Sequence, residues 1–337
     1  MPNRDTPERM PGHLPAPWKF LGPIARDHGL AAIGVAPAGP APQIAKQCFD
    51  SWIAAGYHAE MAYMTRYQDQ RRDIGHPGIL SRAKTVIVAA LPYGNGAVQT
   101  GLWQHVASHA RGRDYHATLK ERLWEISRHI VDRFPASNCR VFVDTAPIME
   151  RTWALCSGIG HLGKNGLVLV PGIGGRVVLG EIVCASTPSS PMHKPSTPFE
   201  LCGDCDLCIE ACPTGALCFP AVVDASRCLS YWSIEQRGPK IPKEIAQQMS
   251  LVFGCDQCTS VCPHERPDTR TALDPPLNQG PSTLSLDQIA AMTENTLTKL
   301  IDKTPLARTG SNTILRNTRA VLKRLSLRNC LQAPTVE

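Results

Sequence analysis

Closely spaced cysteines constrain this chain more than any other feature. Residues 202–213 read Cys-Gly-Asp-Cys-Asp-Leu-Cys-Ile-Glu-Ala-Cys-Pro, a C-x2-C-x2-C-x3-C-P run, and a looser set follows at Cys228, Cys255, Cys258 and Cys262. The N-terminal residues are polar and proline-rich and lack the apolar segment of a secretory signal, so we expect a cytoplasmic chain with reduced thiols. Clustered reduced cysteines are more typical of metal binding than of disulfides.

The cysteine spacing favours two [4Fe–4S] clusters. Three thiolates at intervals of three positions can bind one cluster, and in two-cluster ferredoxins the fourth cysteine of the run ligates the other cluster. Structural zinc also uses paired C-x2-C units, but it needs neither the third closely spaced cysteine nor the Cys-Pro that ends both sets. We therefore predict one cluster on Cys202, Cys205, Cys208 and Cys262, and a second cluster on Cys212, Cys228, Cys255 and Cys258.

The rest of the chain indicates an α/β core followed by smaller units. The 337 residues are 43% hydrophobic, which excludes disorder of the whole chain, and no run of eighteen apolar residues could span a membrane. Residues 84–93 and 140–143 predict buried strands, 114–134 and 147–157 predict helices, and 167–170 with 177–183 predict a hairpin. The expected units are a flexible N-terminal tail over 1–16, an α/β core over 17–185, a Ser/Thr/Pro-rich linker over 186–199, the cysteine module over 200–270 and a basic helical segment over 271–337.

Asp144 is the first candidate for chemistry in the core. It follows a predicted buried strand and precedes a helix, a place where α/β folds present functional groups. A carboxyl in an apolar site has a raised pKa and can donate a proton. A helix-capping role explains the position equally well. The nearby Gly158-Ile-Gly160-His-Leu-Gly163 ends a predicted helix, so we interpret it as a helix end and not as a dinucleotide site.

Several further motifs occur in order along the chain. They include Gly112-Arg-Asp-Tyr-His116, Val143-Asp-Thr-Ala-Pro147, Gly160-His-Leu-Gly-Lys-Asn165, Leu179-Gly-Glu181 and Arg227-Cys-Leu-Ser-Tyr231 with Ile234-Glu235. Together with the cysteine module they resemble the epoxyqueuosine reductases, cobalamin-dependent iron–sulfur enzymes of tRNA modification. The resemblance covers about residues 20–325.

The resemblance implies both a fold and a reaction. The fold is an α/β (α+β) nitroreductase-like cobalamin-binding core, fused to a ferredoxin-like double [4Fe–4S] module with a short helical C-terminal segment. The reaction is the reduction of epoxyqueuosine to queuosine at the wobble position of tRNA anticodons, with Asp144 as proton donor. The electrons would come from a low-potential donor such as flavodoxin or ferredoxin, and we expect a monomer without a membrane partner.

The resemblance also implies cobalamin contacts, and none of them is a histidine ligand to cobalt. The expected cobalamin-binding residues are Arg72, Asp144, Val168, Leu179, Ser230, Asp256 and Gln257.

The C-terminal segment is strongly basic. Residues 303–336 hold seven Lys or Arg side chains and no acidic one, which exceeds the net charge of +6 for the whole chain. Such a run is commonly a solvated helix face, but with the resemblance we expect contacts to tRNA phosphates. The candidate residues are Arg308, Arg316, Arg319, Lys323 and Arg324.

Two other functions remain open from the sequence. One is a related cobalamin and iron–sulfur reductase acting on a small molecule, for example by reductive dehalogenation. The other is an electron-transfer protein whose core binds no cofactor.

Overall fold

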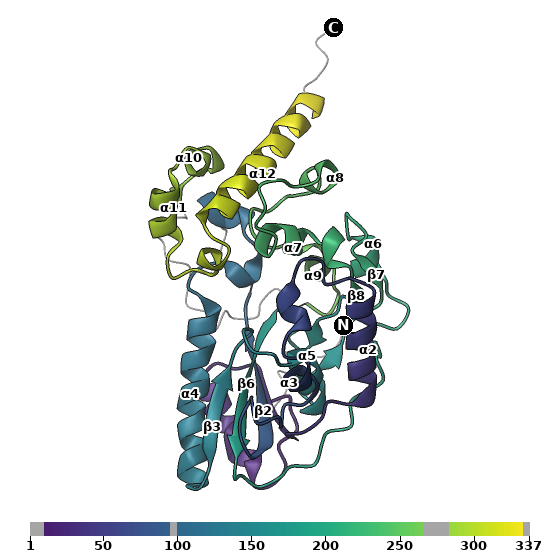
Figure 1. Ribbon diagram of the computed structural model, residues 1–337, viewed down its shortest axis with the longest axis vertical. Helices are drawn as coiled ribbons and strands as arrows, with labels where there is room; N and C mark the ends of the chain where they lie inside the picture. The colour runs from purple at the N-terminus through teal and green to yellow at the C-terminus, as the bar shows by residue number, and fades with distance from the viewer. Residues whose placement is uncertain (1–9, 95–99, 266–282, 333–337) are drawn as a thin grey trace.

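A four-stranded antiparallel sheet forms the centre of the core (Figure 1). This computed structural model describes residues 10–94, 100–265 and 283–332, and for residues 328–332 it describes the backbone alone. The strand order is β1-β2-β6-β3. The strands are β1 (Ala32–Pro37), β2 (Ala83–Pro92), β6 (Val177–Ala185) and β3 (Asn138–Phe142). Residues 85–92 of β2 are all buried, as predicted for a strand covered on both faces.

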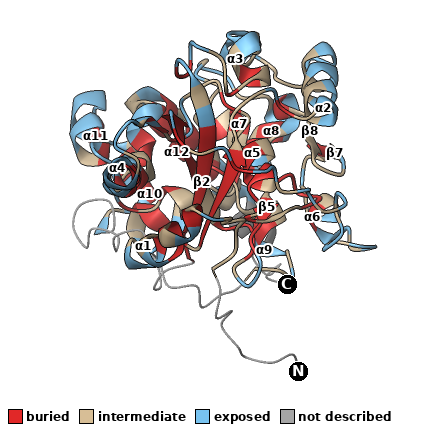
Figure 2. Ribbon diagram, turned by 90° about the horizontal axis from the view of Figure 1, so that it is seen from below, coloured by how far each residue is buried: buried red, intermediate tan, exposed pale blue. Residues whose placement is uncertain are grey.

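Helix α4 (Tyr115–Arg133) covers one face of the sheet and shows why the sequence predicts it well. The Asp114 side chain accepts a hydrogen bond from the backbone N–H of His116 and so caps the first turn. Leu119, Leu123 and Ile126 recur at helical spacing, and none of their surface is exposed. Together with α1 (Leu21–Asp27) they build the first core cluster (Figure 2). Burying each such side chain contributes about 1.5–3 kcal/mol.

Helix α5 (Glu150–Cys156) covers the opposite face and belongs to the second core cluster. The helix ends at Ser157, and Gly158 follows with a φ of +69°, a left-handed conformation that favours glycine after a helix. The interpretation of this glycine motif as a helix end is therefore confirmed.

The predicted hairpin between 167–170 and 177–183 is wrong. Strand β5 (Val168–Leu169) pairs with β4 (His161–Leu162), whereas β6 lies between β2 and β3 in the central sheet. β6 pairs with β2 over nearly its whole length, and this pairing buries far more backbone and side-chain surface than a two-residue partner could.

The N-terminal residues 10–16 line the open edge of β1 and are not a tail. The Val35 N–H donates to the His13 carbonyl at 2.9 Å, and the His13 N–H donates to the Ser157 carbonyl at 2.8 Å. Met10 and Leu14 pack on the first core cluster. The expected flexible tail is thus wrong for residues 10–16, while residues 1–9 lie outside the described residues.

The remaining elements of the core are helices. They are η1 (Trp18–Phe20), α2 (Gln43–Ala54), η2 (Ala62–Thr65), α3 (Gln68–Arg72), η3 (Gly101–His105) and η4 (Ser108–Ala110).

The cysteine module and the C-terminal helices share a third core cluster. It combines Leu102 and Trp103 of the core segment with Leu229 and Phe253 of the module and with residues of the last helices. The module contains α6 (Leu207–Glu210), β7 (Leu217–Phe219), β8 (Val222–Val223), η5 (Ala225–Arg227), α7 (Leu229–Ile234), α8 (Lys243–Ala246) and α9 (Gln257–Ser260). The C-terminal elements are α10 (Leu286–Ala290), α11 (Glu294–Ile301), η7 (Pro305–Arg308) and α12 (Ser311–Gln332).

Asn317 ties α12 to the module. Its buried side-chain amide donates to the carbonyls of Ser233, at 2.9 Å, and Val252, at 2.8 Å. The third core cluster contains residues of the core, the cysteine module and the C-terminal segment. The expected boundaries between these units therefore remain a prediction. Among the described residues, no helix is both long and apolar enough to span a membrane.

Candidate active site and cluster-binding module

Asp144 lies at the end of β3, where the core meets the C-terminal segment. Its φ is +57°, a left-handed conformation that side chains other than Gly, Asn and Asp rarely adopt. The position is not a helix cap, because α5 begins only at Glu150 and its N-cap residue is Met149. The Asp144 backbone N–H instead donates to Glu150 Oε1 at 2.7 Å.

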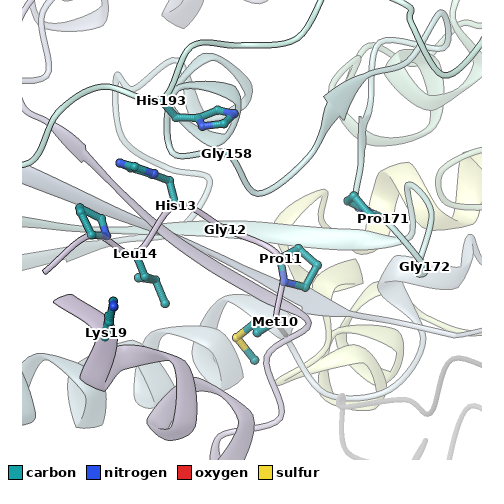
Figure 3. Close-up of a pocket in the computed structure, with 11 residues that line it drawn as sticks. Met10, Pro11, Gly12, His13, Leu14, Lys19, Gly158, Pro171, Gly172 and His193 are labelled. Carbon is teal, nitrogen blue, oxygen red and sulfur yellow. The ribbon is translucent and has the colours of Figure 1, made fainter. Parts of the chain in front are cut away.

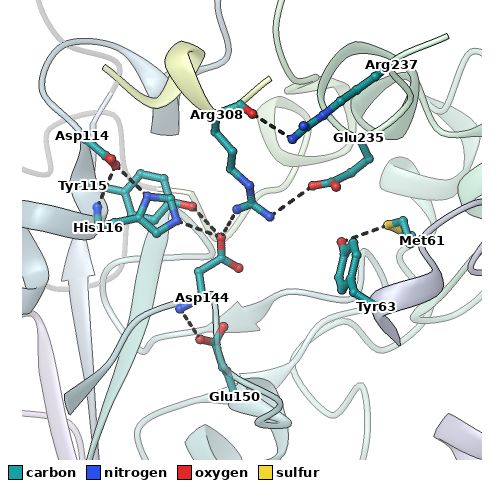
Figure 4. Close-up of polar contacts among 10 residues, drawn as sticks. All are labelled: Met61, Tyr63, Asp114, Tyr115, His116, Asp144, Glu150, Glu235, Arg237 and Arg308. Atoms are coloured by element: carbon teal, nitrogen blue, oxygen red, sulfur yellow. Dashed lines mark hydrogen bonds and ion pairs between the residues drawn. The ribbon is translucent and has the colours of Figure 1, made fainter. Parts of the chain in front are cut away.

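Three donors converge on one oxygen of the Asp144 carboxylate (Figure 4). Tyr115 Oη donates to Oδ2 at 3.1 Å, His116 Nε2 lies 3.0 Å from it, and Arg308 Nη1 donates at 2.7 Å. Arg308 also approaches Glu235 Oε1 at 3.4 Å through its second nitrogen. The site therefore combines the core, the module and the segment after α11.

This environment lowers the pKa of Asp144 and does not raise it. Burial by itself raises the pKa, but the hydrogen bond from His116 and the charge of Arg308 outweigh burial and hold it well below its ordinary value. The prediction that apolar surroundings keep a proton on Asp144 is therefore wrong for this arrangement. Asp144 is a carboxylate here and must receive a proton before it can donate one.

His116 holds the proton that Asp144 lacks. Burial favours the neutral ring, but hydrogen bonds to Asp114 and Asp144 raise its pKa to about 9. The ring Nδ1 lies 2.6 Å from Asp114 Oδ1. At neutral pH the imidazolium thus lies between two carboxylates.

Sequence reasoning missed the roles of Tyr115, His116 and Glu235. The available signal was the Asp-Tyr-His triplet at residues 114–116, where Asp114 caps a predicted helix and Tyr115 and His116 form its first turn. Glu235 offered no local signal, because Arg308, its partner in the site, lies 73 residues away in the sequence.

The predicted ligands of the first cluster surround a single cavity. Cys202, Cys205, Cys208 and Cys262 all line it, together with Lys164. The backbone N–H of Lys164 donates to Cys202 Sγ at 3.4 Å. This N–H belongs to the core, so the core touches the cluster site directly.

The predicted ligands of the second cluster are also neighbours. Burial, and then the nearby thiols of Cys228 and Cys212, raise the pKa of Cys258 to about 11. The pKa of Cys255 rises to about 12, by burial and then by Cys228 and Cys258. The first four cysteines thus share one cavity, and the other four lie close enough for their charges to interact. Their assignment as ligands remains a prediction.

Among the side chains described in 10–94, 100–265 and 283–327, no group of three or more His, Cys, Asp or Glu is arranged to hold a single metal ion.

The expected cobalamin contacts lie in several places. Asp256 accepts hydrogen bonds from the backbone N–H and hydroxyl of Ser108, at 2.8 and 2.7 Å. Val168 is buried in the second core cluster, so its side chain faces protein and does not line an open pocket as expected. Arg72 pairs with Asp50 at 2.6 Å, at the end of α3.

The other expected contacts fit a corrinoid chemically. Leu179 is a half-buried apolar side chain, Ser230 is half-buried and Gln257 is exposed. A corrinoid combines an apolar macrocycle with amide side chains, so it needs both apolar contacts and polar partners. The residues present therefore fit the cofactor.

The basic residues separate into three groups. Arg308 belongs to the Asp144 site, with Nη1 2.7 Å from Asp144 Oδ2, and its expected contact with tRNA remains a prediction. Arg316 donates to the carbonyls of Trp232, at 2.6 Å, and Gly238, at 2.5 Å, and to two side chains, so its guanidinium serves packing and not phosphate binding. Arg319 and Lys323 are exposed one turn apart on α12, and Arg324 Nε donates to the Gln247 carbonyl at 3.0 Å.

A separate surface pocket lies beside the N-terminal segment (Figure 3). His13 and Lys19 line it from one side and His193 from the other. Its described lining includes neither Asp144 nor a predicted cluster cysteine, so this pocket is distinct from both candidate sites.

Comparison with known proteins decides the family. Residues 76–145 match the family described as "Epoxyqueuosine reductase QueG, DUF1730", and residues 201–265 match the "4Fe-4S double cluster binding domain". An epoxyqueuosine reductase of Gloeobacter violaceus is 34% identical over 309 residues, which cover 88% of this chain and 93% of that protein. The chain belongs to the epoxyqueuosine reductase family.

Solved structures of epoxyqueuosine reductases have the same fold. A selenomethionine-labelled member superposes with a TM-score of 0.80 at 25% identity, covering 93% of this chain and 83% of that chain. A second, described with an epoxyqueuosine-modified tRNA-Tyr stem loop, has a TM-score of 0.79 at 24% identity over 93% and 82% of the two chains. The expected fold class is therefore confirmed, with an α/β core, a double-cluster module and C-terminal helices.

Proposed function

We propose that this protein reduces epoxyqueuosine in tRNA to queuosine. The observation that carries the proposal is the Asp144 carboxylate, held by His116 and Arg308 beside the double-cluster module in a chain of the epoxyqueuosine reductase family. The relative with a bound tRNA stem loop supports tRNA as the substrate. An enzyme that acts on tRNA works where tRNA is, so we place it in the cytoplasm.

Two [4Fe–4S] clusters and cobalamin supply the electrons. The clusters would be held by the two cysteine sets, and reduced cobalamin supplies the reducing power at the epoxide. Leu179, Ser230 and Gln257 would hold the corrinoid. A low-potential one-electron donor such as flavodoxin or ferredoxin reloads the clusters, and the protein acts as a monomer.

The residues around Asp144 handle the proton and the substrate oxygen. Asp144, once protonated, donates to the epoxide oxygen as the carbon–oxygen bond breaks. His116 and Tyr115 fix the orientation of its carboxyl group. Arg308 must leave Asp144 or share it when the substrate enters, because its guanidinium is paired with the carboxylate that would donate to the epoxide.

The exposed basic side chains of α12 support RNA binding. Arg319 and Lys323 lie on one face of the helix that follows Arg308. Phosphate contacts from this face would bring an anticodon loop toward Asp144.

The test is conversion of epoxyqueuosine-containing tRNA by anaerobically purified protein with cobalamin and a chemical reductant. Mass spectrometry of the digested tRNA should show queuosine. Asp144→Asn should abolish the product while leaving iron content and cobalamin binding unchanged, and Asp287→Asn, at an exposed position of α10, should retain full activity. No queuosine from the cofactor-loaded wild-type protein would refute the proposal.

A further inference from the structure

We propose that Glu150 and Glu181 form a proton store beneath Asp144 and return a proton to it during each turnover. The inference deepens the function proposed above, because it concerns the protons that the reaction consumes. Neither glutamate touches the reacting atoms in this proposal, and both act through Asp144.

The stoichiometry of the reaction requires more protons than Asp144 holds. Converting an epoxide to an alkene breaks both carbon–oxygen bonds, consumes two electrons and two protons, and releases the oxygen as water. The proposed donor and clusters supply the electrons. Asp144 is ionised by Arg308 and His116, so each proton that it delivers must first come from a neighbouring group.

The geometry places Glu181 in the layer below Asp144. Glu181 on β6 lies opposite Phe142, the last residue of β3, and Asp144 follows two residues later. The Glu181 side chain is fully buried, and neither of its carboxylate oxygens has a hydrogen-bond partner within the described residues. A buried carboxylate without a partner costs several kcal/mol, so this group is protonated.

Glu150 connects this buried carboxyl to Asp144. It is the first residue of α5, which packs on β6, and its Oε1 accepts the backbone N–H of Asp144 at 2.7 Å (Figure 4). All three side-chain donors of Asp144 reach Oδ2. The other oxygen, Oδ1, is the one that can take a proton from Glu150.

The electrostatics keep Glu181 protonated at neutral pH and leave Glu150 about half protonated. Burial and the charge of Asp144 raise the pKa of Glu150 to about 7, and burial followed by the charge of Glu150 raises that of Glu181 well above its ordinary value. The charged and titratable groups that face the pair are Asp144, His116, Tyr115, Arg71 and Arg151.

The transfer is balanced in charge and protons. A neutral Glu150 gives its proton to the Asp144 carboxylate and becomes a carboxylate itself. Glu181 then passes its proton to Glu150 when the two carboxyl groups come into contact, and Glu150 delivers this second proton to Asp144. Two protons from bulk solvent restore both glutamates before the next turnover. A purely structural neutral carboxyl would need none of these steps, and glutamine would replace it without consequence.

The experiment compares Glu181→Gln and Glu150→Gln with wild type in multiple-turnover reduction of epoxyqueuosine tRNA. Glutamine keeps the shape but releases no proton, so we expect the rate to fall about tenfold or more in each variant. Glu181→Asp, which retains a transferable proton, should recover much of the rate. Glu125→Gln, an exposed change on α4, is the matched control and should match wild type.

The pH profile and an infrared spectrum separate this role from packing. The wild-type rate should decrease as pH rises through about 7, where Glu150 loses its proton, and Glu150→Gln should lack that decrease. Infrared spectra of the protein without substrate should show a neutral-carboxyl band that Glu181→Gln removes. Unchanged rates and pH profiles in both variants, or no such band, would overturn the proton store. If wild type makes no queuosine yet shows the band, the proposed function fails and the buried neutral carboxyl stands.

Discussion

The protonation of His116 is the most direct consequence of the charges around Asp144. Replacing Asp144 with Asn removes one of the two carboxylates that hold the imidazolium and leaves Asp114. A carboxylate at this distance raises a histidine pKa by about one unit or more. We therefore expect the pKa of His116 to fall from about 9 by roughly one unit, which is worth about 1.4 kcal/mol.

The same shift links stability to pH. The rise from 6.5 to about 9 corresponds to roughly 3 kcal/mol of free energy of unfolding. Because the folded-state pKa is the higher one, this stabilisation is complete below 6.5 and is lost as pH rises through about 9. His116→Gln should lack this component of the pH dependence.

The assay is an NMR titration of histidine-labelled protein, with His116→Gln used to assign the resonance. Asp287→Asn, on the exposed side of α10, is the control and should leave the His116 pKa at its wild-type value. A wild-type His116 that titrates near 6.5, or one whose pKa Asp144→Asn does not change, would refute the reasoning about the site.

Two other predictions concern the cysteines and the basic helix. Cys205→Ser should lower the iron content by about half, measured by metal analysis of anaerobically purified protein, because one cluster is lost and the other retained. Cys218→Ser, in the same module but outside both sets, should keep full iron, and equal content in both variants would contradict the assignment. Replacing Arg319 and Lys323 with Ala should weaken tRNA binding and reduce the salt slope of log affinity by roughly two, measured by filter binding at several salt concentrations. Arg316→Ala should instead lower the melting temperature, and an unchanged salt slope in the double variant would place the RNA elsewhere.

Local patterns in the sequence predicted the parts of the fold that depend on local interactions. The apolar spacing of Leu119, Leu123 and Ile126 predicts α4, and the cysteine intervals predict the four cysteines that line one cavity. The hairpin prediction failed because β5 and β6 are both apolar, and their apolar patterns do not encode which strand each one pairs with.

The chemistry of the site depends on distant partners and could not be predicted in the same way. His116 is 28 residues from Asp144 and Arg308 is 164 residues from it. The apolar residues beside Asp144 in the sequence predict a raised pKa for its carboxyl group. The cations His116 and Arg308 lower that pKa instead. The basic run likewise predicts positive charge, but only packing of α12 on the module turns Arg316 inward while Arg319 stays exposed.

Mass spectrometry of tRNA tests the central claim most directly. In a host that relies on this gene for the modification, deleting the gene should cause epoxyqueuosine to accumulate in tRNA in place of queuosine. The wild-type gene should restore queuosine, whereas the Asp144→Asn variant should restore none. Queuosine that persists without the gene, with no epoxyqueuosine accumulating, would contradict the assignment of this protein to epoxyqueuosine reduction.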